Sequence, residues 1–299
     1  MTTEHAEHAE HAEHTEDPEH AERPGRGRDT EFSYAYAVVR PAAGLDGDAL
    51  REVEGVAAGP VRLVGAGGVA AAVGSVPGRE FSEAALRHHL EDLEWLEEVA
   101  RAHHGVVEFL AARTTVLPLR LATVYVDDER VREVLRGGAG TFARLLDRFA
   151  GHVEWGVKVY AGLPRDLADP DAPGPSGTGP DAGPGRSYLR MRRREREDRE
   201  AVRSAAAEAA RRVEEAADGI AVELARHRPQ QGELAAGSGE NVANDSYLVP
   251  GGRSEEFRDR VRRATRDLPG VRVEITGPWA PYSFAVLTGP EAPGGTSRP

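Results

Sequence analysis

The chain has 299 residues and a mass of 32.1 kDa, a length that favours two domains. Cysteine is absent, which excludes disulfides, thiolate nucleophiles, iron–sulfur clusters and cysteine-bound zinc. The formal net charge is −12, but residues 1–22 hold eight of the acidic side chains and no Lys or Arg, which leaves 42 acidic against 38 basic side chains elsewhere. The body of the protein is therefore close to neutral, and no general electrostatic field is expected to attract nucleic acid.

Membrane insertion and export are not expected. The longest apolar runs, such as Val69–Val73, are far shorter than the ~18 residues that a membrane span requires. The acidic N-terminal region lacks the charged-then-apolar pattern of an export signal. These features predict a soluble, cytoplasmic protein that does not act at a membrane.

Three segments have compositions that do not support a packed core. Residues 1–30 contain the repeat Glu-(His-Ala-Glu)3-His, which could be a weak metal-binding tract. The repeat has no apolar residue larger than Ala that could be buried, so residues 1–30 are predicted to be a disordered tail. Residues 161–187 contain six Pro and six Gly and predict a linker, and residues 289–299 predict a second disordered tail. Two foldable blocks remain, residues 31–160 and 188–288.

The first block mixes strand and helix patterns. Residues 32–40 predict a strand, and residues 61–64 and 69–76 predict a hairpin around a Gly-rich turn. Ser82 is the predicted N-cap of one long helix, because apolar residues recur every three or four positions from Leu86 to Leu110. The remaining predicted elements are a strand region over 116–126 interrupted by Pro118, helices over 129–136 and 141–149, and a closing strand over 153–160.

The second block opens with a long helical pattern over 189–227, bent at Gly219 and ended by Pro229. Further along the block, strands are predicted over 234–236, 242–249, 271–276 and 282–287, together with a helix over 255–267 capped by Ser254. This mixture, with its hairpin-like connections, predicts an α+β fold with mixed or antiparallel sheets, and units of β-α-β-β-α-β type fit the lengths.

Nucleotide-binding motifs are not supported. Residues 65–70 superficially match a dinucleotide fingerprint, but the following Val73, Gly74 and Pro77 indicate a returning strand where that motif needs a helix. A phosphate-binding Walker loop needs Gly-Lys before Ser or Thr, and the single lysine, Lys158, stands between two valines.

Metal and catalytic sites are equally unsupported. The helical histidines lack a Glu three residues before them, and His103 lies on the apolar stripe, where a hydrogen-bonded core residue is the simpler interpretation. No serine occurs in Gly-x-Ser-x-Gly, and no spatial pairing of carboxylates can be read from one sequence. We therefore expect a non-enzyme with no catalytic residue, no metal and no cofactor. The histidines concerned are His88, His89, His103 and His104.

One basic cluster, between Arg190 and Arg199, leaves an alternative open. It could bind nucleic acid in a protein built from ferredoxin-like modules. However, acidic residues are interleaved with the arginines at i,i+4, as in Arg193 with Glu197 and Arg196 with Glu200, and a solvated helix with ion pairs explains the pattern.

Five segments, in order along both blocks, resemble the gas vesicle protein GvpL/GvpF family. Tyr34–Val39 resembles its N-terminal strand, and Val116–Val124 resembles its Leu-Pro-Leu-Arg-Phe-Gly-Thr segment. The other three are Glu154–Lys158, Tyr247–Val249 and Gly277–Phe284. The sequence departs from the family pattern at Leu121-Ala122, where Phe-Gly is expected, and at Ala280, where a second Pro is expected.

The resemblance implies an accessory protein of gas vesicle assembly that binds the small hydrophobic shell protein and can be retained as a minor shell component. It also implies other accessory proteins as partners, a location in the cytoplasm and on the gas vesicle, and a modified ferredoxin-like C-terminal domain. Five residues of the matching segments are candidates for partner binding or fold integrity: Arg120, Trp155, Lys158, Trp279 and Tyr282.

Overall fold

A computed structural model describes residues 30–42, 45, 47–89, 91–162, 184–229 and 239–286. The predicted tails, 1–30 and 289–299, lie almost entirely outside these residues, as do most of the predicted linker and the predicted strand over 234–236.

The first sheet is built around β1 (Glu31–Val39), whose residues from Ser33 onward are all buried. β1 pairs antiparallel with β3 (Val69–Pro77) on one side, and with β4 (Val116–Pro118) and β5 (Val124–Tyr125) on the other. β2 (Val61–Ala66) pairs with β3 through the predicted hairpin, so the strand order is β2-β3-β1-β4. The predicted strand at 32–40 and the predicted hairpin are confirmed.

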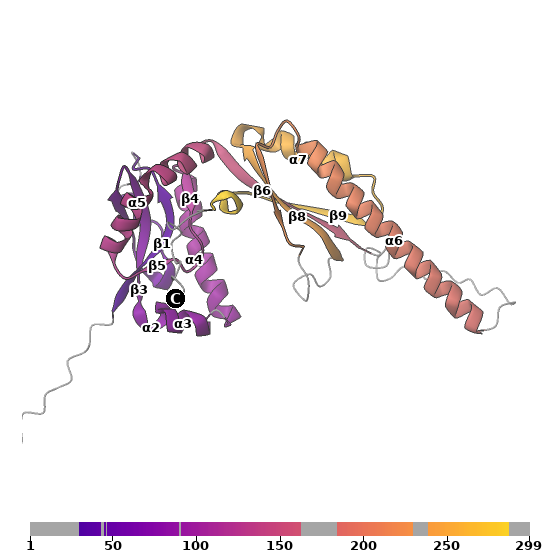
Figure 1. Cartoon of the computed structure of the whole chain (residues 1–299), viewed down its shortest axis with the longest axis horizontal. Coiled ribbons are helices and arrows are strands. Elements are labelled where there is room, and N and C mark those ends of the chain that lie inside the picture. Colours follow the sequence, from indigo (N-terminus) through magenta and orange to yellow (C-terminus); the bar gives the residue numbers. More distant parts are fainter. Residues whose placement is uncertain are drawn as a thin grey trace, which may run out of the picture.

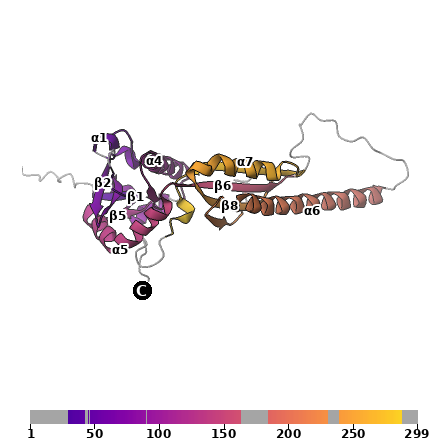
Figure 2. The same ribbon diagram turned by 90° about the horizontal axis from the view of Figure 1, so that it is seen from above.

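Two long helices cover the two faces of this sheet (Figure 2). Tyr34 and Tyr36 of β1 pack with α4 (Leu93–Ala111) in what we call the α4-side core. Ala35 and Val38 of the same strand pack with α5 (Asp128–Phe149) in the α5-side core. A strand that is buried on both faces explains why its sequence is almost continuously apolar.

The single long helix predicted after Ser82 is wrong. The chain forms two short helices, α2 (Gly78–Phe81) and α3 (Glu83–His89), before α4 begins. Asp92 ends the run, because its carboxylate accepts hydrogen bonds from the N–H groups of the first turn of α4 and so caps a new helix. Leu93, expected on the buried stripe, is 77% exposed. A four-residue helix, α1 (Gly47–Leu50), and a 3-10 turn, η1 (Val56–Ala58), connect β1 to β2.

The two helices predicted over 129–149 are one continuous helix, α5. Of the glycines in this stretch, Gly138 lies closely against a neighbouring side chain. A Cβ at Gly138 would lie 2.6 Å from the ring of Phe142, and the hairpin turn at Gly67, where φ is +63°, comes against Ala139. Small residues therefore let the tip of the β2–β3 hairpin pack on the helix.

The second sheet has the order β7-β8-β6-β9, and its neighbouring strands are antiparallel. Its strands are β6 (His152–Ala161), β7 (Glu223–His227), β8 (Glu240–Pro250) and β9 (Val271–Trp279). The strand over 153–160 is predicted as the last element of the first block. The structure corrects that assignment, because β6 pairs along its whole length with β8 and along most of it with β9.

One face of the second sheet carries α6 (Pro184–Ala217) and α7 (Ser254–Thr265), which follows a 3-10 turn, η3 (Gly251–Arg253). The alanines of α6 pack against Trp155, Val157 and Phe257 in the second-sheet core. From Tyr188 to Ala201 every residue except Glu195 is exposed, and this part of α6 extends beyond the sheet (Figure 1). The last residues of the predicted linker, 184–187, belong to this helix.

Two further expectations for the second block are wrong. The helix predicted to reach residue 227 ends at Ala217, because Gly219 adopts φ of +69° and the chain then enters β7. Ser254 does not cap α7. Its hydroxyl accepts a hydrogen bond from the indole N–H of Trp155 at 3.1 Å. The two antiparallel sheets with their helices nevertheless confirm the predicted α+β class.

The α5-side core generates a stability prediction. Phe142 is 1% exposed, so Phe142→Ala is expected to lower the free energy of unfolding by about 3–5 kcal/mol through lost burial and a cavity. Leu93→Ala, at a residue that is 77% exposed, serves as the control and should change it by less than about 0.5 kcal/mol. Urea unfolding of both variants checks this, and similar losses in the two would contradict it.

Candidate functional site

The junction between the two sheets is organised by a short 3-10 turn, η4 (Tyr282–Phe284), in place of the strand predicted over 282–287. Its three residues point to three different parts of the protein. Tyr282 packs against the α4-side core, and Phe284 is buried in the α5-side core. Ser283 bonds to the second sheet. Figure 1 shows η4, in yellow, between the two sheets.

The bond between η4 and the second sheet is a two-point hydrogen bond to Glu154 of β6. The backbone N–H of Ser283 donates to Glu154 Oε2 at 2.8 Å, and its hydroxyl donates to Oε1 at 2.6 Å. The Ser283 oxygen also lies 3.0 Å from both Ser246 Oγ and His227 Nε2. Because Glu154 is only 7% exposed, its carboxylate depends on these bonds, and we call the pair the Glu154–Ser283 clamp.

A serine, a histidine and a carboxylate in contact have the composition of a hydrolytic triad, but these are connected differently. In a triad the carboxylate orients the histidine, which accepts the serine proton. Here the backbone N–H and the hydroxyl of Ser283 both donate directly to the Glu154 carboxylate. His227 contacts the hydroxyl oxygens of Ser246 and Ser283 through its Nε2 atom only. The arrangement therefore fixes the chain, and no nucleophile is activated.

Further contacts hold the two sheets together. Leu248 of β8 is fully buried in the α5-side core with Phe149 and Phe284, so the second sheet contributes to a core of the first. Arg148 at the end of α5 forms an ion pair with Glu223 of β7.

His103 lies where α4, β1 and η4 meet. Its Nδ1 is 3.0 Å from the Tyr34 hydroxyl, which also accepts a hydrogen bond from the N–H of Ala122. The side chain is 3% exposed, and its ring lies 6.4 Å from that of Tyr282. The interpretation of His103 as a hydrogen-bonded core residue is confirmed.

Between α4, the α5–β6 turn and the β9–η4 segment lies a groove of about 570 Å³. Val107, Val116 and Phe149, all nearly fully buried, contribute its apolar interior. Trp279 lines it with 39% of its surface exposed, and its ring packs against that of His104 at 5.1 Å. We call this the junction groove.

The five candidate residues from the sequence do not form one site. Trp279 and Tyr282 meet at the junction, where both contact His104. Trp155 is 4% exposed in the second-sheet core, and Lys158 lies on the sheet face that the helices do not cover, in register with Glu274. Arg120 is exposed in the connection between β4 and β5.

Sequence reasoning missed Glu154, Ser283 and His104. Glu154 and Ser283 both lie inside segments that match the family, so both residues could be selected from the sequence. Their contact could not, because it joins residues 129 positions apart. His104 was considered only as a metal ligand.

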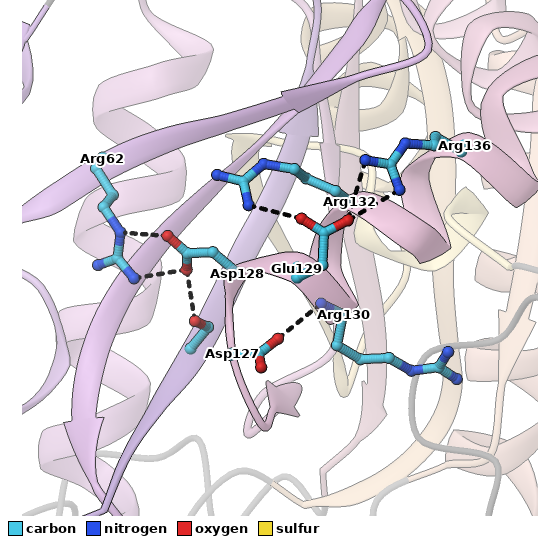
Figure 3. A network of polar contacts seen from close by, with 8 residues as sticks. Arg62, Asp127, Asp128, Glu129, Arg130, Arg132 and Arg136 are labelled. Atoms are coloured by element: carbon cyan, nitrogen blue, oxygen red, sulfur yellow. Dashed lines mark hydrogen bonds and ion pairs between the residues drawn. The ribbon is translucent and has the colours of Figure 1, made fainter.

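A second polar network fixes the start of α5 (Figure 3). Arg62 of β2 donates two hydrogen bonds to the Asp128 carboxylate, and Ser33 of β1 donates a third. The Arg62 guanidinium is the main reason that the pKa of Asp128 lies below its ordinary value. Asp127 caps the helix, and Glu129 accepts hydrogen bonds from Arg132 and Arg136, which lie about one and two turns further along α5. The network is structural, because each charge has an internal partner.

Within the described ranges, no three His, Asp or Glu side chains come together as metal ligands. None of the helices in those ranges combines the length and apolar character needed to cross a bilayer.

Comparisons with known proteins agree with each other. The family model "Gas vesicle synthesis protein GvpL/GvpF" matches residues 32–286. Two Streptomyces sp. (strain CB03234) proteins are similar. Gas vesicle protein L is 44% identical, with 84% of this chain and 92% of that protein covered, and gas vesicle protein F is 30% identical, with 75% and 87% covered.

Solved structures show the same fold. The crystal structure of gas vesicle protein GvpF from Microcystis aeruginosa superposes with a TM-score of 0.56 at 17% identity, covering 86% of this chain and 99% of that one. The GvpF structure from Anabaena sp. PCC7120 gives a TM-score of 0.55, also at 17% identity, with 87% and 98% covered.

The clamp can be tested by Glu154→Gln, which leaves one acceptor where two are needed. The free energy of unfolding should fall by about 1.5–3 kcal/mol, the range for hydrogen bonds to a charged group. Glu274→Gln, on the uncovered face of the same sheet, is the control and should cost less than 1 kcal/mol. Urea unfolding measures both, and equal stability of Glu154→Gln and wild type would show that the clamp contributes nothing.

The buried histidine predicts a pH dependence. Burial lowers the pKa of His103 to about 4, whereas in the unfolded chain it is near 6.5. Between these values the unfolded state binds the extra proton, so the free energy of unfolding should fall by roughly 3 kcal/mol as the pH drops from 6.5 to 4. Urea unfolding at several pH values should show a shallower fall for His103→Gln, and parallel curves would contradict this.

Proposed function

Because the chain belongs to the gas vesicle GvpL/GvpF family, we propose that it is a non-enzymatic accessory protein of gas vesicle assembly that binds the small hydrophobic shell subunit. Membership of the family implies involvement in gas vesicle formation. The finer role, direct binding of the shell subunit, is the proposal.

A physical need supports this role. A subunit that lines a gas space must present apolar surface before it is assembled, and in water such surface drives aggregation. A partner that covers this surface keeps the subunit available. That task requires a complementary surface but no cofactor and no reaction.

The junction groove is the observation that carries the proposal. It offers a mostly apolar interior and a half-exposed Trp279, in a position held by both sheets and the clamp. Large aromatic side chains of this kind are the usual anchors of protein interfaces. We therefore assign Trp279 to partner binding, and Trp155 and Tyr282 to fold integrity. Lys158 and Arg120 lie outside the groove and have no role in this proposal.

Two further features belong to it. The second sheet follows the order β-α-β-β-α-β with both helices on one face, which supports a modified ferredoxin-like domain. A place in the cytoplasm and on the gas vesicle, with other accessory proteins as additional partners, follows from the proposed role. Nucleic-acid binding by the Arg190–Arg199 region has no support, because the arginines there form ion pairs such as Arg193–Glu197 within the helix.

The proposal is tested by co-expressing the full chain, tagged, with a gas vesicle shell protein and recovering the tag. The shell subunit should stay soluble and co-purify, unlike with the bare tag. Trp279→Ala should keep its fold and recover at least fivefold less subunit, whereas Trp155→Ala should lower the unfolding temperature, because it empties a buried site. No recovery of the subunit by a folded wild-type chain would refute the binding role.

A further inference from the structure

The first residues of β6 line the junction groove, and on the edge of β6 that faces β9 they have no paired β9 residue. β6 pairs with β8 from its beginning, where His152 stands opposite Pro250 and Val153 opposite Val249. Its pairing with β9 begins only at Glu154, opposite Trp279. Gly151, His152 and Val153 all line the groove.

β9 does not continue alongside these residues, because the chain turns away after Trp279. The N–H of Tyr282 donates to the carbonyl of Ala280 at 2.8 Å, which closes the turn into η4. The clamp then holds η4 on the sheet. Beside His152, on the side of β6 that faces β9, the second sheet therefore has space for a strand that β9 does not fill.

The direction in which the backbone groups of His152 point follows from the hydrogen-bond pattern between β6 and β8. In antiparallel strands, successive residues direct their N–H and C=O groups to opposite sides. The N–H of Gly251 donates to the carbonyl of Gly151 at 2.8 Å, and Pro250, which stands opposite His152, has no N–H, so His152 and Pro250 form a non-hydrogen-bonded pair of the β6–β8 ladder. The N–H and C=O of the next residue, His152, then face the β9 side, towards the groove.

The walls beside this edge are mostly apolar, and Glu108 is the one carboxylate among the lining residues. The side chains at the end of α4, Ala111 and Ala112, are small, and the interior beyond them is formed by Val107, Val116 and Phe149. The volume of about 570 Å³ lies in the range of sites that enclose a ligand. Trp279, at the end of β9, stands beside the space as an aromatic anchor.

We propose that an extended, predominantly apolar segment of the shell subunit binds in the junction groove and pairs with the backbone of His152, taking the place that β9 leaves. This inference rests on the proposed function and names the surface and the conformation of the partner. A helical segment would be the poorer occupant, because its backbone groups are already bonded to one another and could not satisfy those of His152.

The groove is tested by filling it from α4. Ala111→Trp places a large ring in the groove from an exposed position, and Glu98→Trp places the same ring on an exposed part of α4 outside it. In co-expression with the shell protein, Ala111→Trp should recover at least tenfold less subunit, and Glu98→Trp should match wild type. Ala112→Arg is a second blocking variant, tested alongside the first, and the unfolding temperatures of both are compared with that of wild type.

The outcomes separate the two proposals. If folded wild type recovers no shell protein, the proposed function is wrong. If wild type recovers it and both folded blocking variants do so within twofold, the function stands and the groove inference is overturned. Loss in the blocking variants alone supports the groove.

The extended conformation has its own test. Overlapping synthetic peptides that cover the shell protein are labelled, and their binding to the full wild-type chain is measured by fluorescence anisotropy. The tightest peptide is then resynthesised with single N-methyl groups, which remove one backbone donor each. Pairing with His152 predicts at least tenfold weaker binding at the one position that donates to its carbonyl and little change at the neighbouring positions. Losses below twofold at every position would overturn strand pairing.

Discussion

The arrangement of the two sheets depends on the hydrogen bonds between Ser283 and the carboxylate of Glu154. A carboxylate that is 7% exposed is costly to bury without partners, so the fold retains it only while Ser283 supplies its two donors. Those donors bring η4 to the sheet, and η4 in turn carries Tyr282 and Phe284 into the two cores of the first sheet. This one buried carboxylate thus links the second sheet, through η4, to both cores of the first sheet, in addition to the packing of Leu248 in the α5-side core.

The junction groove is a consequence of the same constraint. Because the chain must turn at Ala280 to present Ser283 to Glu154, it cannot continue as a strand beside the first residues of β6. The turn leaves His152 with one edge unpaired by β9 and leaves Trp279 at the rim, half exposed. The contact that stabilises the junction therefore also creates the surface to which we assign partner binding.

Charge has a local role elsewhere in the protein. The Asp128 carboxylate is bonded by Arg62 and Ser33 and anchors the start of α5 to the first sheet. On the exposed part of α6, arginines pair with acidic residues one turn away, so its basic cluster is largely neutralised within the helix. Neither arrangement provides a surface for a charged ligand, which is consistent with recognition through apolar contacts.

The local sequence was sufficient to predict β1, the β2–β3 hairpin, β8 and the α+β class, because period-two and continuous apolar patterns report burial directly. The family, too, could be recognised from short segments. Two predicted helices had wrong bounds because a capping side chain and a single backbone angle overrode the apolar pattern. Asp92 capped a new helix inside an apolar stripe, and Gly219 ended α6 ten residues before its predicted end.

Neither β6 nor η4 could be placed from the sequence. β6 follows the first block along the chain, yet its partners are β8 and β9, which are encoded some 80 to 120 residues later. Tyr282–Phe284 alternates like a strand, but its side chains enter three separate environments. The sequence by itself determined most of the strands, the α+β class and the family to which the chain belongs. Only the tertiary structure decided the sheet partners, the clamp and the groove, because these depend on contacts between residues that no local pattern relates.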